Sequence, residues 1–138
     1  MVSVRELMHE LTKVSGEKTV AEVAKLMKNK EIGSVVVEEK GKIKGIITER
    51  DILKRVVAEG KDPKRTKASE IMTPNPKTID GNADLLAASE KISQMNVRRL
   101  LITDKTGKIV GIVTARNIVK SIPYHVARIK LGDYVRKG

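Results

Sequence analysis

Cysteine, phenylalanine and tryptophan are absent from this chain of 138 residues, and tyrosine and histidine occur twice each. Without cysteine the chain has no disulfides and no thiolate metal sites. His9 and His125 lie far apart in sequence, so we expect no zinc site, and we expect His9 to have a plain surface or packing role. The scarcity of aromatic side chains also argues against single-strand nucleic-acid binding, which usually uses aromatic stacking platforms.

Long apolar runs are absent as well. No segment approaches the roughly 20 apolar residues of a membrane span, and the N-terminus lacks the apolar core of a signal peptide. We therefore expect a soluble, cytoplasmic protein. The length fits one compact unit or two small interlocked ones.

Acidic residues are outnumbered by basic ones, and the formal net charge is +11. Much of the excess lies in KDPKRTK at 61–67 and in the C-terminal stretch at 128–138. Such a charge favours anionic partners without identifying them. Solvated surface is the preferred interpretation of both stretches, and attraction to nucleic acid is the alternative.

An internal repeat runs through most of the sequence. The segment KIKGIITERDIL at 42–53 aligns with KIVGIVTARNIV at 108–119, and EIGSVVV at 31–37 aligns with NVRRLLI at 96–102. Further upstream, RELM aligns with SEIM at an offset of about 65 residues, which is long for a solenoid unit, and there are only two copies. Two copies predict a fold with pseudo-two-fold symmetry and one site per copy.

Each copy predicts the element order β-α-β-β-α. An amphipathic helix begins after Thr19, which is a good N-cap with Glu22 at the capping-box position. Glycine-containing turns join two strands into a hairpin, and the second strand runs directly into another helix, with Pro123 ending the last one. In the first copy the predicted extended segments are 13–15, 34–39 and 42–48, and the terminal helix is 51–58. In the second copy the predicted extended segments are 77–79, 99–104 and 108–114, and the terminal helix is 117–121.

Thr48 and Asp51 lie where the second strand meets this helix. A Thr followed three residues later by an acid forms a capping box, which explains both residues without a ligand. The same geometry also suits a nucleotide: the helix N-terminus and the Thr hydroxyl attract a phosphate, while Asp51 accepts hydrogen bonds from two ribose hydroxyls. The two interpretations stay open on these residues alone.

Together, GIITERD at 45–51, GIVTARN at 111–117, IGSVVV and VRRLLI resemble the CBS domain, named from cystathionine β-synthase, in its tandem form, the Bateman module. The resemblance covers about residues 2–121. It implies an α/β (α+β) fold of two β-α-β-β-α repeats related by pseudo-two-fold symmetry, with small mixed sheets packed together and helices outside. We expect CBS domain 1 at 1–62, CBS domain 2 at 63–122 and a basic tail at 123–138.

The resemblance also implies two symmetry-related clefts, which in this family commonly bind AMP, ADP, ATP or S-adenosylmethionine. The motif Asp would bind the ribose, the motif Thr would approach the phosphate, and the first extended segment and the residue after the helix would hold the adenine. Arginines of the partner copy would reach the phosphates. The residues expected at the main site are Val14, Ser15, Ile32, Thr48, Arg50, Asp51, Arg98 and Arg99.

The second copy departs from the pattern. Asn117 replaces the acid and lacks its charge and symmetric acceptors, and Gly33 and Ser34 stand where the other copy has arginines. We therefore expect a weaker or empty second site. Its predicted residues are Thr78, Ile79, Val97, Thr114, Arg116 and Asn117.

No catalytic constellation occurs, because Ser-His-Asp sets, paired carboxylates in a motif and phosphate loops are all missing. The resemblance predicts a stand-alone regulatory module that binds an adenosine-containing ligand, signals to an unknown partner protein and forms a homodimer, without a metal or further cofactor. The alternative is a nucleic-acid-binding protein that uses the basic surface of the same scaffold.

Overall fold

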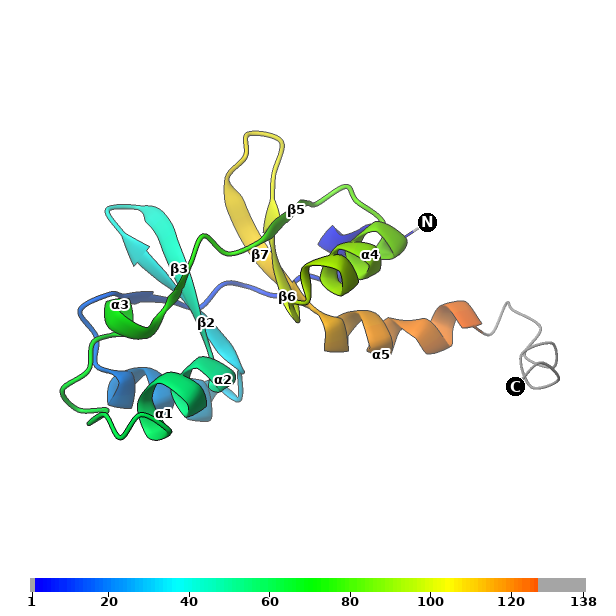
Figure 1. Ribbon diagram of the computed structural model, residues 1–138. Coiled ribbons are helices and arrows are strands. Elements are labelled where there is room, and N and C mark those ends of the chain that lie inside the picture. Colours follow the sequence, from blue (N-terminus) through cyan, green and yellow to red (C-terminus); the bar gives the residue numbers. More distant parts are fainter. Residues whose placement is uncertain (1, 127–138) are drawn as a thin grey trace, which may run out of the picture. The chain divides into compact units, whose positions relative to one another are not determined.

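The computed structural model describes residues 2–126, which form two compact units (Figure 1). The Asp51 unit is Glu10–Lys77, and the Asn117 unit combines the segment up to His9 with the chain from Thr78 onwards. The predicted fold class is confirmed: each unit is a small mixed sheet with helices. The predicted boundary at 62/63 follows the repeats along the sequence. The compact units differ from the repeats, because the short helical turn that begins each repeat belongs to the unit formed mainly by the other repeat.

A four-stranded sheet forms the Asp51 unit, in the order β1 (Lys13–Ser15), β2 (Ser34–Glu39), β3 (Lys42–Thr48) and β4 (Thr73–Pro74). Strand β1 runs parallel to β2, and the other pairs are antiparallel. The helices are α1 (Val20–Lys30), α2 (Glu49–Ile52), a π-helical turn η2 (Leu53–Val57) and α3 (Ala68–Ile71).

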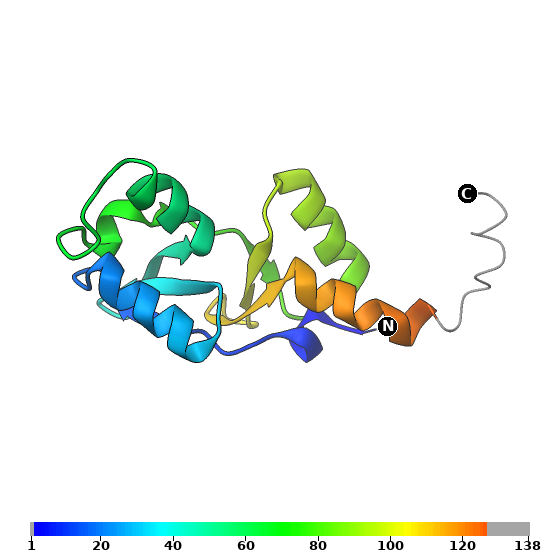
Figure 2. The same cartoon turned by 90° about the horizontal axis from the view of Figure 1, so that it is seen from below.

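A three-stranded sheet forms the Asn117 unit, in the order β5 (Thr78–Asp80), β6 (Arg99–Thr103) and β7 (Ile109–Thr114). Its pairing repeats that of β1, β2 and β3, with a parallel and then an antiparallel pair. The helices are the 3-10 turn η1 (Val4–Leu7), α4 (Leu85–Met95) and α5 (Ala115–Val126). Figure 2 shows α4 and α5 side by side within this unit.

Local signals place the element boundaries. The Thr19 hydroxyl accepts a hydrogen bond from the Glu22 backbone at 3.2 Å, which confirms the predicted N-cap of α1. Lys40 and Gly41 both have positive φ, at 50° and 77°, as a two-residue type I′ hairpin turn requires. In the longer second hairpin, Asp104 accepts a hydrogen bond from the Thr106 hydroxyl, and this bond lowers the pKa of Asp104.

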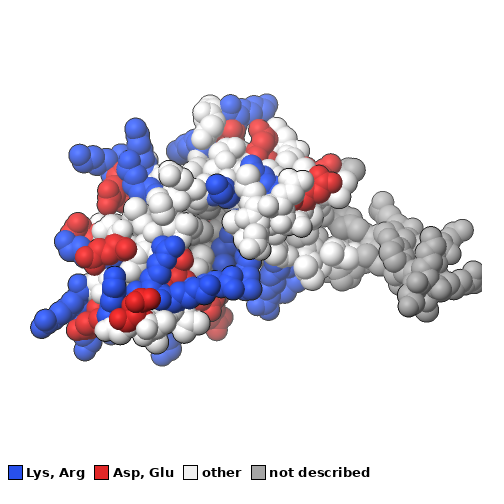
Figure 3. All heavy atoms as spheres, in the orientation of Figure 1, with Lys and Arg blue, Asp and Glu red and all other residues white. Residues whose placement is uncertain are grey.

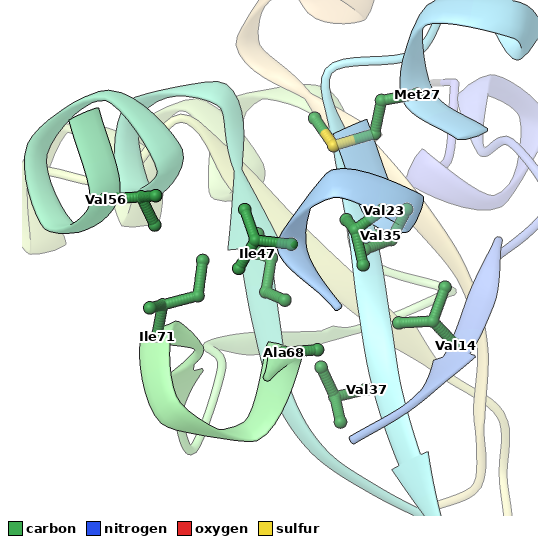
Figure 4. Packing of buried hydrophobic residues seen from close by; sticks show 10 residues of the cluster. Val14, Val23, Met27, Val35, Val37, Ile47, Val56, Ala68 and Ile71 are labelled. Carbon is green, nitrogen blue, oxygen red and sulfur yellow. The ribbon is translucent and has the colours of Figure 1, made fainter. Parts of the chain in front are cut away.

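The core of the Asp51 unit lies on one face of its sheet (Figure 4). Val35 and Val37 of β2 and Ile47 of β3 point to this face, because alternate residues of a strand share a face. Helix α1, the turn η2 and helix α3 cover them with apolar side chains, among them Val20, Val23, Met27, Val56 and Ile71. Burying one such side chain stabilises the fold by about 1.5–3 kcal/mol, so this packing fixes the strand-to-helix junction at Thr48.

Two helix predictions need correction. The segment predicted as one helix at 51–58 begins at Glu49 and changes to π-helical geometry at Leu53. Helix α5 does not end before Pro123 but continues to Val126. Proline lacks the N–H that would bond to the carbonyl four residues earlier, and its ring crowds that carbonyl, so a helix passes through it only at a cost. The predicted tail beyond residue 126 lies outside the described residues.

Candidate functional site

The Thr48–Asp51 motif forms a reciprocal capping box at the start of α2. Asp51 Oδ2 accepts hydrogen bonds from the Thr48 backbone N–H at 2.9 Å and from its hydroxyl at 3.2 Å, and the Thr48 hydroxyl accepts one from the Asp51 N–H at 3.2 Å. The structural interpretation of the motif is therefore confirmed. Because the cap uses Oδ2, the second carboxylate oxygen is held in a fixed direction.

Asp51 Oδ1 meets two further groups. The Thr73 hydroxyl, from β4, donates to it at 3.3 Å, and the Nε of Arg55 lies 4.0 Å away. The Asp51 side chain is 14% exposed, so the carboxylate remains accessible to a small extent. A carboxylate has about four lone-pair positions, and these contacts leave room for a further donor at Oδ1.

Thr73 can reach Asp51 because Gly45, which has no side chain, lets the segment that carries Thr73 approach β3. A Cβ at Gly45 would lie 2.6 Å from Met72 Sδ and 2.8 Å from the Thr73 carbonyl oxygen, closer than any side chain allows. The glycine of the GIITERD motif is thus required because the segment that begins the other repeat in sequence packs closely against it. It positions Thr73 beside the motif acid.

The Asn117 unit repeats this arrangement with different residues. Asn117 Oδ1 accepts from the Thr114 N–H at 3.0 Å and from its hydroxyl at 2.8 Å, and the Asn117 N–H donates to the Thr114 hydroxyl at 3.1 Å. Gly111 admits Met8 as Gly45 admits Met72. The residue that follows, His9, places its Nε2 2.9 Å from Asn117 Nδ2. His9 is exposed, in keeping with the expected surface or packing role, and the residue that it contacts is the motif amide.

The other residues predicted for the main site divide between the units. In the Asp51 unit, Val14 is buried in the core, Ile32 is half-buried against it, and Ser15 and Arg50 are exposed. Arg98 and Arg99 belong to the Asn117 unit, where Arg98 is exposed and Arg99 is half-buried. The structure therefore brings together Val14, Ser15, Ile32, Thr48, Arg50 and Asp51 in one compact unit, and the role of the arginines stays a prediction.

The residues predicted for the second site all belong to the Asn117 unit. Ile79 is buried in its core, with Val97 packed against it, and Thr78 is half-buried and Arg116 exposed. Strand pairing matches Ile79 with Ile102 as it matches Val14 with Val37. The equivalents of Val14 and Ser15 are therefore Ile79 and Asp80.

Four residues near the two motifs were missed from the sequence. Arg55 and Thr73 contact Asp51, His9 contacts Asn117, and Lys91 of α4 donates to the Thr78 carbonyl. The alignment of RELM with SEIM does place His9 over Thr73. It could not show that each segment packs against the motif of the other repeat.

Charge around the site is mixed. On the face drawn in Figure 3, Lys and Arg side chains are interspersed with Asp and Glu over the Asp51 unit. Between residues 2 and 126, no three His, Asp or Glu side chains converge as metal ligands would. Within the same range, no helix is long and apolar enough to span a bilayer.

Comparison with known proteins identifies the family. The CBS domain model matches twice, at residues 4–58 and 68–124. The chain belongs to the CBS-domain family. The chain is 39% identical over 114 residues to the CBS domain-containing protein YhcV of Bacillus subtilis, covering 82% of this chain and 80% of that protein.

Two other relatives extend the comparison. An uncharacterized protein of Methanopyrus kandleri is 40% identical over 117 residues, and the match covers 84% of this chain but only 60% of that protein. A CBS domain protein of Pyrobaculum aerophilum, whose structure is a complex with AMP, has 26% identity and a TM-score of 0.75. That match covers 84% of this chain and 89% of the other. The fold and the tandem arrangement of the CBS pair are thus established.

Proposed function

We propose that this CBS pair is a regulatory module that binds an adenosine-containing ligand (AMP, ADP, ATP or S-adenosylmethionine) at Asp51 and signals its presence to a partner protein. The observation that carries the proposal is the Asp51 carboxylate, which Thr48 fixes through one oxygen and whose side chain stays partly exposed. The AMP complex of the Pyrobaculum aerophilum relative supports the ligand class. The proposed role is regulatory rather than catalytic.

The ribose is the part of the ligand that Asp51 suits. A ribose presents two adjacent hydroxyl donors, and a carboxylate oxygen with spare lone pairs accepts them in charge-assisted hydrogen bonds. The Thr73 hydroxyl, which donates to Asp51, keeps its own lone pairs for a ribose donor. Half-buried Ile32 offers apolar surface for the base, and Arg50 a nearby positive charge for the phosphate, whereas the contributions of Val14, Arg98 and Arg99 follow from the family resemblance alone.

Calorimetric titration of the chain with AMP, ADP, ATP and S-adenosylmethionine tests this proposal. We expect saturable binding of at least one of them, and a melting temperature that rises with its concentration. A ligand at 100 times its dissociation constant adds about 2.7 kcal/mol to the stability of the folded state. Absence of binding by all four ligands would contradict the proposal.

The basic surface makes nucleic acid the competing partner. Binding to a nucleic-acid backbone weakens steeply as salt rises, because condensed counterions are released, whereas a ligand held in a pocket responds less. Titrations with AMP and with a mixed-sequence RNA at about 50 and 200 mM salt therefore separate the two. Tight RNA binding with a steep salt slope, together with no AMP binding, would favour the nucleic-acid function.

We also propose that the chain forms a homodimer through its helices. Large apolar side chains are exposed on the motif helices and on α4: Leu53, Val57, Leu86, Met95, Val119 and Ile122. Burying such side chains against a partner removes apolar surface from water, which favours association. A second copy of the chain is the occupant that the family resemblance implies, and the regulated partner protein remains to be identified.

A further inference from the structure

The two motifs of this chain differ in how much hydrogen-bonding capacity they leave for a ligand. Oxygen Oδ1 of Asp51 carries one hydrogen bond, the 3.3 Å contact from the Thr73 hydroxyl. Oxygen Oδ1 of Asn117 carries two, both from Thr114, at 2.8 and 3.0 Å. An amide oxygen has two lone pairs, so Asn117 has no acceptor left for a ribose hydroxyl.

The amide cannot turn over to free that oxygen. The backbone N–H of Thr114 only donates, so the group facing it must be the amide oxygen. The Asn117 Nδ2 group must then face His9, whose Nε2 lies 2.9 Å away. Because an amide nitrogen donates, His9 Nε2 acts as the acceptor, which is the role that this atom has in the tautomer with the ring proton on Nδ1.

A second intramolecular contact involves strand β5, next to the residues that correspond to Val14 and Ser15. Lys91 of α4 donates from its ammonium group to the carbonyl of Thr78 in β5, the strand predicted to hold the adenine. In the Asp51 unit, the aligned residue of α1 is Leu26, which packs against the core. The Asn117 unit thus places a cation at the base-binding strand, where the Asp51 unit places an apolar side chain.

We propose that His9 and Lys91, together with Asn117, close the second site of the CBS pair to nucleosides. This inference rests on the proposed function and deepens it: three side chains, rather than the single change from Asp to Asn, limit the chain to one adenosine ligand. Replacing Asn117 by Asp alone creates a carboxylate next to His9. That carboxylate can accept a hydrogen bond from the His9 ring, so the ribose acceptor stays occupied.

The Asp51 unit shows which residues should open the second site to a nucleoside. The residues of the Asp51 unit at the three positions are Thr73, Leu26 and Asp51, so the converting substitutions are H9T, K91L and N117D. Each variant is prepared in the full chain with Asp51→Asn, which weakens the first site and leaves the second to be measured. AMP and adenosine are the probes, and a melting curve of each variant confirms that it folds.

The triple variant H9T/K91L/N117D is expected to bind AMP and adenosine at least about tenfold more tightly than N117D alone, since one or two charge-assisted hydrogen bonds are recovered. H9T and K91L without N117D are expected to gain nothing measurable. A single N117D variant that binds as tightly as the triple variant would overturn the inference. So would a triple variant that binds no better than N117D, provided that the unmodified chain binds AMP at Asp51.

A second measurement does not depend on any ligand. Nitrogen-15 NMR of the His9 ring in the unmodified chain is expected to show the proton on Nδ1 and an unprotonated Nε2 at neutral pH, and N117A is expected to remove this tautomer preference. A ring with its proton on Nε2 would overturn the inference whether or not the protein binds AMP. Failure of the unmodified chain to bind any adenosine ligand, with the tautomer as expected, would instead contradict the proposed function.

Discussion

The guanidinium group of Arg55 donates from Nη1 to the carbonyl oxygens of Ile71, at 2.9 Å, and of Met72, at 3.1 Å. Arg55 therefore ties the π-helical turn after the motif to the segment that carries Thr73. Ser121, the aligned residue of the other repeat, is too short for this and instead donates to the carbonyl of Ile118 in its own helix. A cation thus braces the first motif from a position that serine occupies in the second repeat.

Replacing Arg55 by Ser should loosen this segment. Both carbonyls lose a charged donor. Because the Arg55 side chain is 46% exposed, water can reach the carbonyls and replace part of the lost hydrogen bonding. We expect the free energy of unfolding to fall by about 1 kcal/mol and the affinity for AMP to fall with it. Chemical denaturation and calorimetry measure the two. Arg55→Lys, which keeps the charge without the planar fork, is the control, and full recovery by Lys would contradict the role of the two carbonyl contacts.

Asp51→Asn should separate the cap from the ligand. Asn117 shows that an Asn makes the same capping box in this chain, so the melting temperature should change little. The affinity for AMP should fall roughly 10- to 150-fold, because a charge-assisted hydrogen bond is worth about 1.5–3 kcal/mol.

Asp51→Ala should lower affinity and also stability, by about 1 kcal/mol, because it removes the cap as well. Asn117→Ala is the matched control, with the same cost in stability and no change in AMP binding. Unchanged affinity in Asp51→Asn would remove Asp51 from the site.

Gly45→Ala should push the Thr73 segment away from β3. The added Cβ would lie 2.8 Å from the Thr73 carbonyl oxygen, which is backbone and cannot rotate aside. We expect a loss of about 1–3 kcal/mol in stability and weaker AMP binding, since Thr73 contacts Asp51.

In Gly111→Ala, the nearest backbone atom is 3.1 Å away. We therefore expect a smaller loss of stability and unchanged AMP binding. Equal effects of the two variants on AMP affinity would argue against a role for Thr73 at the site.

The double substitution Leu53→Glu/Val57→Glu should disrupt the proposed homodimer. Leu53 and Val57 are 60% and 65% exposed, so their replacement costs the folded unit little, whereas two carboxylates buried in an interface repel each other and lose solvation. Light scattering should give twice the chain mass of 15.2 kDa for the unmodified protein and the single mass for the variant. A monomeric unmodified protein at micromolar concentration would contradict the dimer.

Local chemistry made much of the fold readable from the sequence. The strands at 34–39 and 42–48 have the predicted bounds, since runs of β-branched apolar residues and a turn of Lys40 and Gly41 act within a few residues. The caps by Thr19, Thr48 and Thr114 were readable for the same reason, because each spans three residues. The repeat itself revealed the family and the unequal motifs.

Only the tertiary structure showed what stands next to each motif. Thr73 and Asp51 are 22 residues apart, and His9 and Asn117 are 108 apart. No periodicity or cap signals such contacts, since they depend on each repeat's first helical turn packing against the motif glycine of the other. The sequence by itself therefore determined the elements, their order and the loss of a charge at Asn117. The exchange of these segments decided that Thr73 meets Asp51, whereas His9 meets Asn117.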